Sequence, residues 1–173
     1  MNDQATTDDA PPKVKSSDSM LKLDEFLPYR LNVLANLTSQ ALSRVYSERY
    51  GIGVPEWRVL VTLGEFGMMT GKAIGAHSHM HKTKVSRAVA ELERRKLVAR
   101  RANREDLRES FLSLTPAGRA IYEDLAPHAL EFARRLAEVI DPQDRPAFER
   151  AVERLTERSR VLAEETARSS GKQ

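Results

Sequence analysis

Hydrophobic residues recur along most of the chain at steps of three and four, which places them on one face of a helix. Before this pattern starts, residues 1–22 are polar and have little to bury, so we expect a disordered arm. The periodic segments predict a mostly helical protein. Its longer helices are expected over 24–50, 55–67, 116–140 and 144–168, followed by a short tail over 169–173.

Local signals mark where several helices begin. Thr115 followed by Pro116 is typical of a helix start, because threonine accepts hydrogen bonds from free N–H groups and proline fits the first turn. Thr70 likewise starts a short helix. A turn connects this short helix to a stronger one, which is expected from about His81 to Lys96.

Two short runs, over 97–101 and 109–114, flank the turn-forming segment ANRED. They predict a two-stranded hairpin. The middle of the chain, over 55–115, is therefore a helix-turn-helix followed by a hairpin. Amphipathic helices flank this charged middle at both ends of the chain.

The helix that starts near His81 has one apolar side. At about 100° per residue, Val85, Ala88, Val89 and Leu92 fall together and form the expected buried stripe. The other sides carry short or cationic side chains, which suit a helix in the major groove of DNA. The candidate DNA contacts of this helix are Thr83, Lys84, Ser86 and Arg87, the last being the candidate for a base edge.

The net charge of +3 hides an uneven distribution. The window 82–108 holds ten basic and four acidic residues, a net charge of +6, whereas the rest of the chain carries −3. Such a cluster indicates a polyanionic partner, most often nucleic acid. Four arginines crowd around the hairpin turn and fit a narrow minor groove: Arg100, Arg101, Arg104 and Arg108.

Two alternatives to DNA binding apply to these charges. The basic side of the helix could be a solvated surface. The hairpin arginines could form ion pairs with neighbouring carboxylates, which are Glu105, Asp106 and Glu109.

Composition argues against several other functions. The chain has no cysteine, which excludes disulfides, thiolate metal ligands and a thiol redox switch. No apolar run approaches the roughly 20 residues of a membrane helix, and the N-terminus lacks the features of a signal peptide, so we expect a cytoplasmic protein that does not bind a membrane. No catalytic residue stands out, so we expect neither an enzyme nor a cofactor.

Three of the four histidines lie in the stretch GAHSHMHKT, which raises the alternative of a zinc-sensing regulator. On a helix His77 and His81 would share a face while His79 would point away, and the stretch is expected to be a turn. No cysteine and few carboxylates are nearby, so no metal ligand is predicted. His81 instead places a titratable group close to the expected DNA surface.

The segment KVSRAVAELERRKLVARRANREDLRESFLSLTPAGR resembles the winged helix-turn-helix core of the MarR family of bacterial transcriptional regulators. The shared motifs are VSR, LERRKLVAR, the D-x-R of Asp106 and Arg108, and LTPAG. The resemblance extends over roughly Asp24 to Leu162. It implies one domain over 23–168, in which a winged helix-turn-helix with a β-hairpin wing joins long helices that form a dimerisation region.

This resemblance also implies how such a protein acts. A homodimer would bind a pseudo-palindromic double-stranded DNA operator, usually as a repressor, with half-sites about one DNA turn apart. Ser86 and Arg87 match DNA-contacting positions of the family. Arg108 would enter the minor groove, supported by Asp106, and a small ligand bound between the dimerisation helices and the DNA-binding lobes would release the DNA.

The stretches LPYRLNVLAN, PEWRVL and KTKVSRAV resemble the branch of the family that controls aromatic-acid catabolism. That branch includes repressors released by hydroxycinnamoyl-CoA thioesters, so an anionic aromatic effector is implied. Arg30 could pair with its carboxylate or phosphate, while Tyr29, Asn36 and Trp57 could line an apolar pocket. The alternatives are core packing for Tyr29 and Trp57 and a surface ion pair for Arg30.

Overall fold

The computed structural model describes residues 21–102 and 109–170 of the chain. The expected disordered arm over 1–22 lies almost wholly outside these residues. Three predicted site residues also lie outside them, namely Arg104, Asp106 and Arg108.

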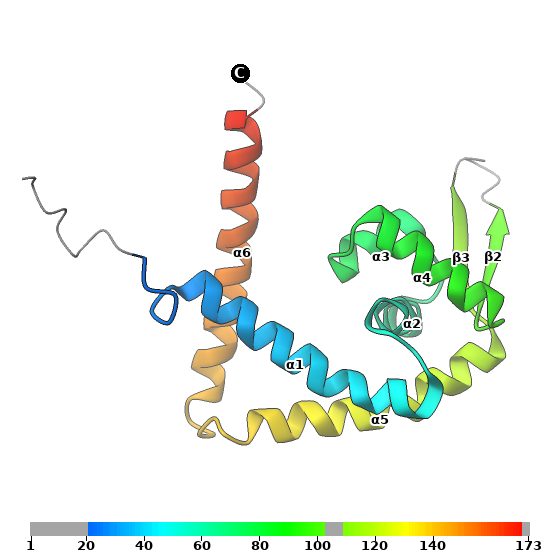
Figure 1. The fold of residues 1–173 in the computed structure, drawn as a ribbon, viewed down its shortest axis with the longest axis horizontal. Helices are drawn as coiled ribbons and strands as arrows, with labels where there is room; N and C mark the ends of the chain where they lie inside the picture. Colours follow the sequence, from blue (N-terminus) through cyan, green and yellow to red (C-terminus); the bar gives the residue numbers. More distant parts are fainter. Residues whose placement is uncertain (1–20, 103–108, 171–173) are drawn as a thin grey trace, which may run out of the picture. The chain divides into compact units, whose positions relative to one another are not determined.

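The chain divides between Ala41 and Leu42 into two compact units. The first unit contains the beginning of helix α1 (Leu27–Tyr50), and the end of that helix belongs to the second. The second unit holds all the other elements (Figure 1). Its further helices are α2 (Val54–Phe66), α3 (Gly71–Ser78), α4 (Lys82–Arg94), α5 (Pro116–Ala137) and α6 (Arg145–Ser170).

The predicted helix starts are confirmed by their hydrogen bonds. The Thr70 hydroxyl accepts a hydrogen bond from the N–H of Ala73 at 3.2 Å and so caps α3. The Thr115 hydroxyl accepts one from the N–H of Gly118 at 3.1 Å, directly before Pro116 at the start of α5. These bonds satisfy N–H groups that a helix leaves free at its first turn.

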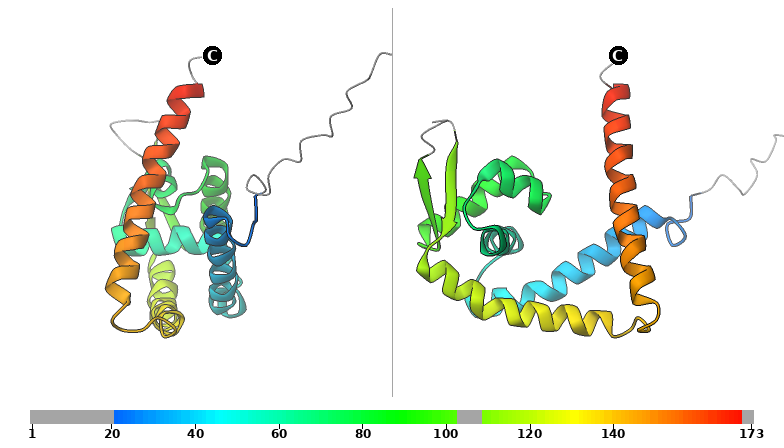
Figure 2. Two further views of the ribbon diagram at one scale, coloured as in Figure 1. Left: turned by 90° about the vertical axis from the view of Figure 1, so that its left-hand side faces the viewer. Right: turned by 180° about the vertical axis from the view of Figure 1, so that it is seen from behind.

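The hairpin is confirmed and belongs to a sheet of three antiparallel strands, β1 (Met69–Thr70), β2 (Val98–Ala102) and β3 (Ser110–Leu114). The two hairpin strands lie side by side in Figure 2, with Val98 opposite Leu114 and Ala102 opposite Ser110. Strand β1 pairs with the other edge of β3 and was not predicted. Two residues are too few to show the alternation by which a strand is recognised.

One buried cluster holds the second unit together. The stripe predicted on α4 is at its centre, because Val85, Ala88, Val89 and Leu92 are each at most 3% exposed. Every neighbouring element contributes to the same cluster. Among its members are Tyr46 of α1, Leu60 and Leu63 of α2, Ile74 of α3, Leu112 of β3 and Leu125 of α5.

The long helices keep large apolar side chains exposed. Helix α6 buries no residue, although its sequence is amphipathic. Its predicted apolar face is between 39% and 48% exposed at Phe148, Val152, Leu155 and Leu162. In the first unit, the apolar face of α1 is similarly exposed at Leu27, Leu31 and Leu34.

Gly118 provides a test of the packing at the start of α5. A Cβ atom built there would lie 2.0 Å from the backbone oxygen of Leu97, which is too close for any real contact. We expect Gly118→Ala to lower the free energy of unfolding by about 1–3 kcal/mol, as overpacked sites do. Urea unfolding at fixed protein concentration measures this change.

Gly71→Ala is the matched control, because a Cβ at that helical position meets nothing within 4 Å. It should leave the stability unchanged or raise it by up to about 1 kcal/mol. Equal stabilities for the two variants would contradict the close packing of α5 on Leu97.

Candidate nucleic-acid interface

Helix α4 turns one side to the core and the opposite side to solvent. Because its stripe is buried, Thr83, Lys84, Ser86 and Arg87 are all exposed, together with Ala90. The structure thus brings together, on one helix, the four α4 residues predicted to contact DNA. Their side chains are short or cationic, which suits close approach to a base edge or a phosphate.

The beginning of α4 has an excess of positive charge. Lys82 and Lys84 lie in its first turn, and no acidic residue is present there. The N-terminal end of a helix carries a partial positive charge, which the two lysine side chains increase. A negatively charged partner bound at this end of α4 would therefore be stabilised. Lys82 was not among the predicted site residues, although its place next to Thr83 would have indicated it.

The cations of the basic window fall into two groups in the structure. Arg94 pairs with Glu91 through bonds of 2.9 and 2.6 Å, and Arg100 pairs with Glu93 through bonds of 2.9 and 3.0 Å. Arg95 donates to backbone oxygens of another segment. The hydrogen bond from Arg94 also holds the pKa of the Glu91 carboxyl below its usual value, so this pair persists to lower pH.

The second group makes no side-chain hydrogen bond or ion pair to any residue that the structure describes. Its members are Lys82, Lys84, Arg87, Lys96 and Arg101. The basic window is therefore not one uniformly unpaired surface, because Arg94, Arg95 and Arg100 are bonded within the protein. Arg94 lies on the outer side of α4 but its charge is already matched by Glu91 one turn earlier.

Arg100 connects α4 to the hairpin. Its partner Glu93 lies near the end of α4, whereas Arg100 itself lies on β2. Arg100 thus forms an ion pair, as the alternative interpretation expected for hairpin arginines, but its partner Glu93 is not one of the carboxylates named there. Arg101 is exposed, and the contacts predicted for Arg104, Asp106 and Arg108 stay predictions because these residues lie outside the described part of the chain.

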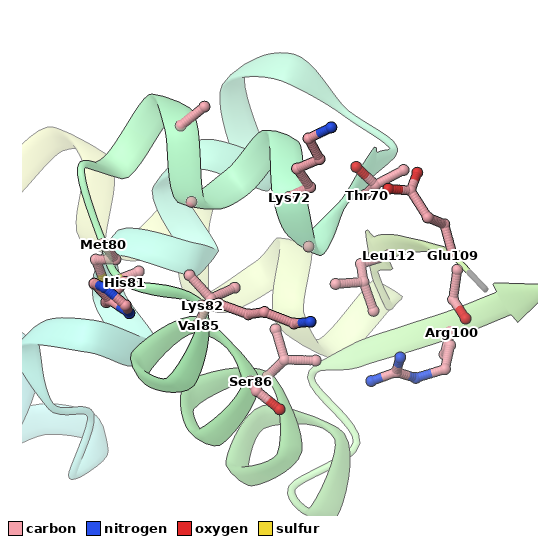
Figure 3. A pocket seen from close by; sticks show the side chains of 15 residues that line it. Thr70, Lys72, Met80, His81, Lys82, Val85, Ser86, Arg100, Glu109 and Leu112 are labelled. Atoms are coloured by element: carbon pink, nitrogen blue, oxygen red, sulfur yellow. The ribbon is translucent and has the colours of Figure 1, made fainter. Parts of the chain in front are cut away.

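A hollow of about 670 Å³ lies between α3, α4 and the sheet. Figure 3 shows Lys82 and Val85 of α4, Lys72 of α3, and Arg100 and Leu112 of the sheet around this space. Apolar side chains and three cations border it together. Lys82 therefore faces a concave surface beside the exposed side of α4. The charge of Arg100 is already matched by Glu93, and the acidic Glu109 also borders the hollow.

The three clustered histidines occupy three different structural positions. The ring of His77, on α3, packs against Phe66 with 4.5 Å between ring centroids. His79 ends α3 in a left-handed conformation, and His81 precedes the first residue of α4. Over residues 21–102 and 109–170, no group of three histidines or carboxylates could hold a metal ion, so the zinc-sensing alternative is not supported.

The predicted effector residues are distributed over both units. Trp57 is 6% exposed and its ring stacks on Tyr46 at a centroid distance of 5.1 Å, as the core-packing alternative expected. Tyr29, Arg30 and Asn36 belong to the first unit and are exposed, and the Asn36 amide donates to the Asn32 side chain at 2.6 Å. The effector site therefore stays a prediction.

Comparison with protein-family models matches residues 50–109 to the MarR family. This range includes α2, α3, α4 and β2, and so contains the helix and the strand that carry the exposed cations described above. The match covers about a third of the chain, and it makes this segment similar to winged-helix transcriptional regulators of the MarR family. Regulators of the MarR family bind DNA and small-molecule ligands and are generally not enzymes.

Solved MarR-family structures have the same fold. A MarR/EmrR family regulator from Acinetobacter sp. ADP1 is 26% identical, with a TM-score of 0.74 over 82% of this chain and 99% of that one. A MarR family regulator from Silicibacter pomeroyi is 28% identical, with a TM-score of 0.66 over 78% and 90% of the two chains. BpsR of Bordetella bronchiseptica, whose DNA binding is regulated by 6-hydroxynicotinic acid, is 19% identical, with a TM-score of 0.71 over 79% and 97%.

No curated protein sequence matches this chain. Within the part of the chain that the structure describes, none of the helices has the length and hydrophobicity needed to cross a bilayer.

The two groups of cations lead to a test with matched variants. Lys84 has no described partner, so Lys84→Ala should weaken DNA binding about equally for all sequences. It should also lower the slope of log affinity against log salt by about one, as the loss of one phosphate contact does. Arg94→Ala removes the same charge about three turns later, where Glu91 already matches it, and should leave the slope unchanged. Equal slopes for both variants, measured by fluorescence anisotropy, would contradict the assignment of Lys84.

His81 leads to a second test. Its side chain caps no N–H group and is exposed at the beginning of α4. If the His81 side chain contacts a DNA phosphate, His81→Asn should weaken DNA binding. His79→Asn, at the end of α3, should leave the affinity unchanged. Equal affinities of His81→Asn and the wild type, measured by fluorescence anisotropy, would contradict this contact.

Proposed function

We propose that this protein is a ligand-responsive repressor that binds a pseudo-palindromic DNA operator as a homodimer. The observation that carries this proposal is the solvent-facing side of α4. There Lys82, Lys84 and Arg87 are exposed and have no partner among the described residues, while the opposite side of the helix is buried. A helix oriented in this way presents its first turns to a DNA groove.

Each candidate residue has a defined role in this complex. Lys84 binds phosphate, and Thr83 and Ser86 approach the base edges and the backbone next to it. Arg87 reads a guanine, because its guanidinium can donate two parallel hydrogen bonds to O6 and N7 in the major groove. From the family resemblance, Arg108 enters the minor groove beside Arg104, and Asp106 supports the hairpin tip.

The homodimer is supported by the exposed apolar faces of the long helices. Val152 and Leu155 of α6 and Leu31 and Leu34 of α1 are each at least 39% exposed. A helix face that exposes several large apolar side chains is typical of protein interfaces. A second copy of the chain would cover it and would set two α4 helices about one DNA turn apart.

The proposed effector is a small anionic aromatic molecule or an aromatic acyl-CoA thioester. The resemblance of α1 to the aromatic-acid branch supports this class of ligand, and BpsR, which responds to 6-hydroxynicotinic acid, shares the fold. Arg30 would pair with the acidic group. Tyr29, Asn36 and Trp57 would line the rest of the effector site.

A gel shift on the promoter region of the protein's own gene tests partner and effector together. The complex should form at low salt and weaken steeply towards physiological salt, because several phosphate contacts release counterions. Micromolar hydroxycinnamoyl-CoA should then dissociate it. Affinity that does not change with salt would contradict the DNA-binding proposal, whereas release by free aromatic acids but not by thioesters would remove only the CoA part.

A further inference from the structure

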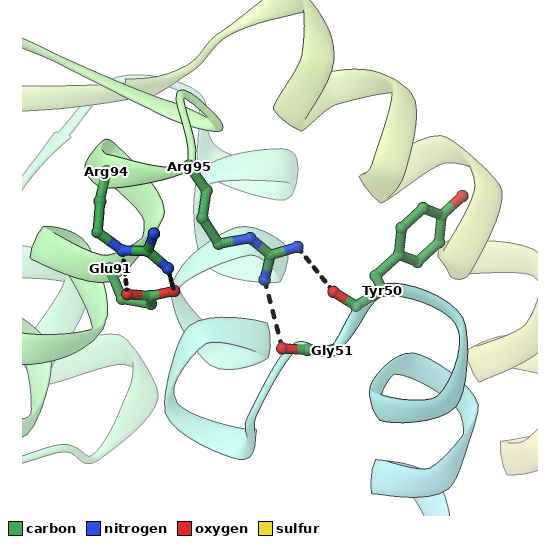
Figure 4. Close-up of polar contacts among 5 residues, drawn as sticks. All are labelled: Tyr50, Gly51, Glu91, Arg94 and Arg95. Carbon is green, nitrogen blue, oxygen red and sulfur yellow. Dashed lines mark hydrogen bonds and ion pairs between the residues drawn. The ribbon is translucent and has the colours of Figure 1, made fainter.

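The side chain of Arg95 connects the end of α4 to the end of α1 by hydrogen bonds. The Arg95 guanidinium donates hydrogen bonds to the backbone oxygen of Tyr50 at 2.7 Å and to that of Gly51 at 3.3 Å (Figure 4). Tyr50 is the last residue of α1, where backbone oxygens lack helical partners and carry the negative end of the helix dipole. A guanidinium suits this position because its fork of donors reaches both oxygens at once.

The end of α1 is in turn held by α5. The Tyr50 hydroxyl donates to the carboxylate of Asp124 at 3.0 Å, and Arg49 pairs with the same carboxylate oxygen at 3.4 Å. Arg95 therefore binds a segment that is itself attached to α5. The bonds form one continuous connection from α5 through the end of α1 to the end of α4.

The turn that follows Arg95 is fixed to the start of α5. The N–H of Thr115 donates to the backbone oxygen of Leu97 at 3.0 Å, and its hydroxyl donates to that of Lys96 at 2.8 Å. Gly118 approaches Leu97 so closely that no side chain fits between them. The end of α4 is thus held on two sides, by α1 through Arg95 and by α5 through the following turn.

Arg95 differs from both of its cationic neighbours. Arg94 points to Glu91 of its own helix, as Figure 4 shows, and Lys96 is exposed with no described side-chain partner. Arg95 is half-buried and directs its guanidinium to a segment more than forty residues earlier in the chain. Its charge is therefore used within the protein.

We propose that Arg95 is a positioning residue for DNA binding. It fixes the orientation of α4 relative to the end of α1 and the start of α5. Because α1 and α5 are proposed to form the dimer, Arg95 also sets the distance between the two α4 helices of the dimer. The inference rests on the proposed function, because it concerns how the distance between the two α4 helices matches the spacing of the operator half-sites. It assigns to Arg95 no contact with DNA.

The test uses the full-length protein and a duplex that the wild type selects from random-sequence DNA. A series of duplexes then has one or two base pairs added or removed between the half-sites. We expect Arg95→Ala to lower affinity for the selected duplex about three- to tenfold, as the loss of charge-assisted hydrogen bonds does. The variant should lose less affinity than the wild type when the spacing between the half-sites is altered. The slope of its log affinity against log salt should be unchanged.

Two further variants separate position from charge. Lys96→Ala removes an adjacent charge without a described partner and should keep the spacing preference of the wild type. Arg95→Lys keeps the charge but lacks the planar fork, so it should relax the spacing preference as Arg95→Ala does. Circular dichroism and light scattering should show that the helical content and the dimer are retained in all three variants.

Several results would overturn the inference. One is an unchanged spacing preference in Arg95→Ala. A second is a salt slope of Arg95→Ala lowered by about one, which would indicate that Arg95 contacts a phosphate directly. A third is a wild-type spacing preference in Arg95→Lys. Loss of the fold in Arg95→Ala together with wild-type spacing preference in a folded Arg95→Lys variant would overturn it as well. Failure of the wild type to select any duplex would instead contradict the proposed function, and the inference with it.

Discussion

Burial of the apolar stripe of α4 is the constraint on which the rest of the site depends. Val85, Ala88, Val89 and Leu92 fill the space between α2, α3 and the sheet, and this fixes the rotation of α4 about its own axis. Since side chains follow the helix at 3.6 residues per turn, everything opposite the stripe must then face solvent. The exposed cations are a consequence of how the core packs.

The two ends of α4 have different roles, because the cations at its beginning have no described partner whereas the arginines at its end are bonded. At its beginning, Lys82 and Lys84 have no described partner and add to the positive end of the helix dipole. At its end, Arg94 and Arg95 are bonded within the protein. An anion therefore gains most at the beginning of the helix, while the end provides the attachment that holds the helix in place.

The long helices pose a separate physical problem. Their apolar faces are too exposed to be explained by the contacts within the described chain, as the absence of any buried residue in α6 shows. Covering such surface is favourable by roughly 25 cal/mol per Å² before the costs of association. A dimer would bury these faces and at the same time join two DNA-binding lobes. The connection from Asp124 through Tyr50 to Arg95 would then link the dimer to each recognition helix.

The sequence by itself determined the features that depend on neighbouring residues. The stripe of α4 followed from its period, and the starts of α3 and α5 followed from Thr70 and Thr115, because caps and helix faces are local. Only the tertiary structure decided that Arg95 is bonded within the protein, since its acceptors lie more than forty residues earlier in the chain. The same reason applies to the pairing of β1 with β3 and to the stacking of Trp57 on Tyr46. Contacts between distant segments leave no periodic signal in a single sequence.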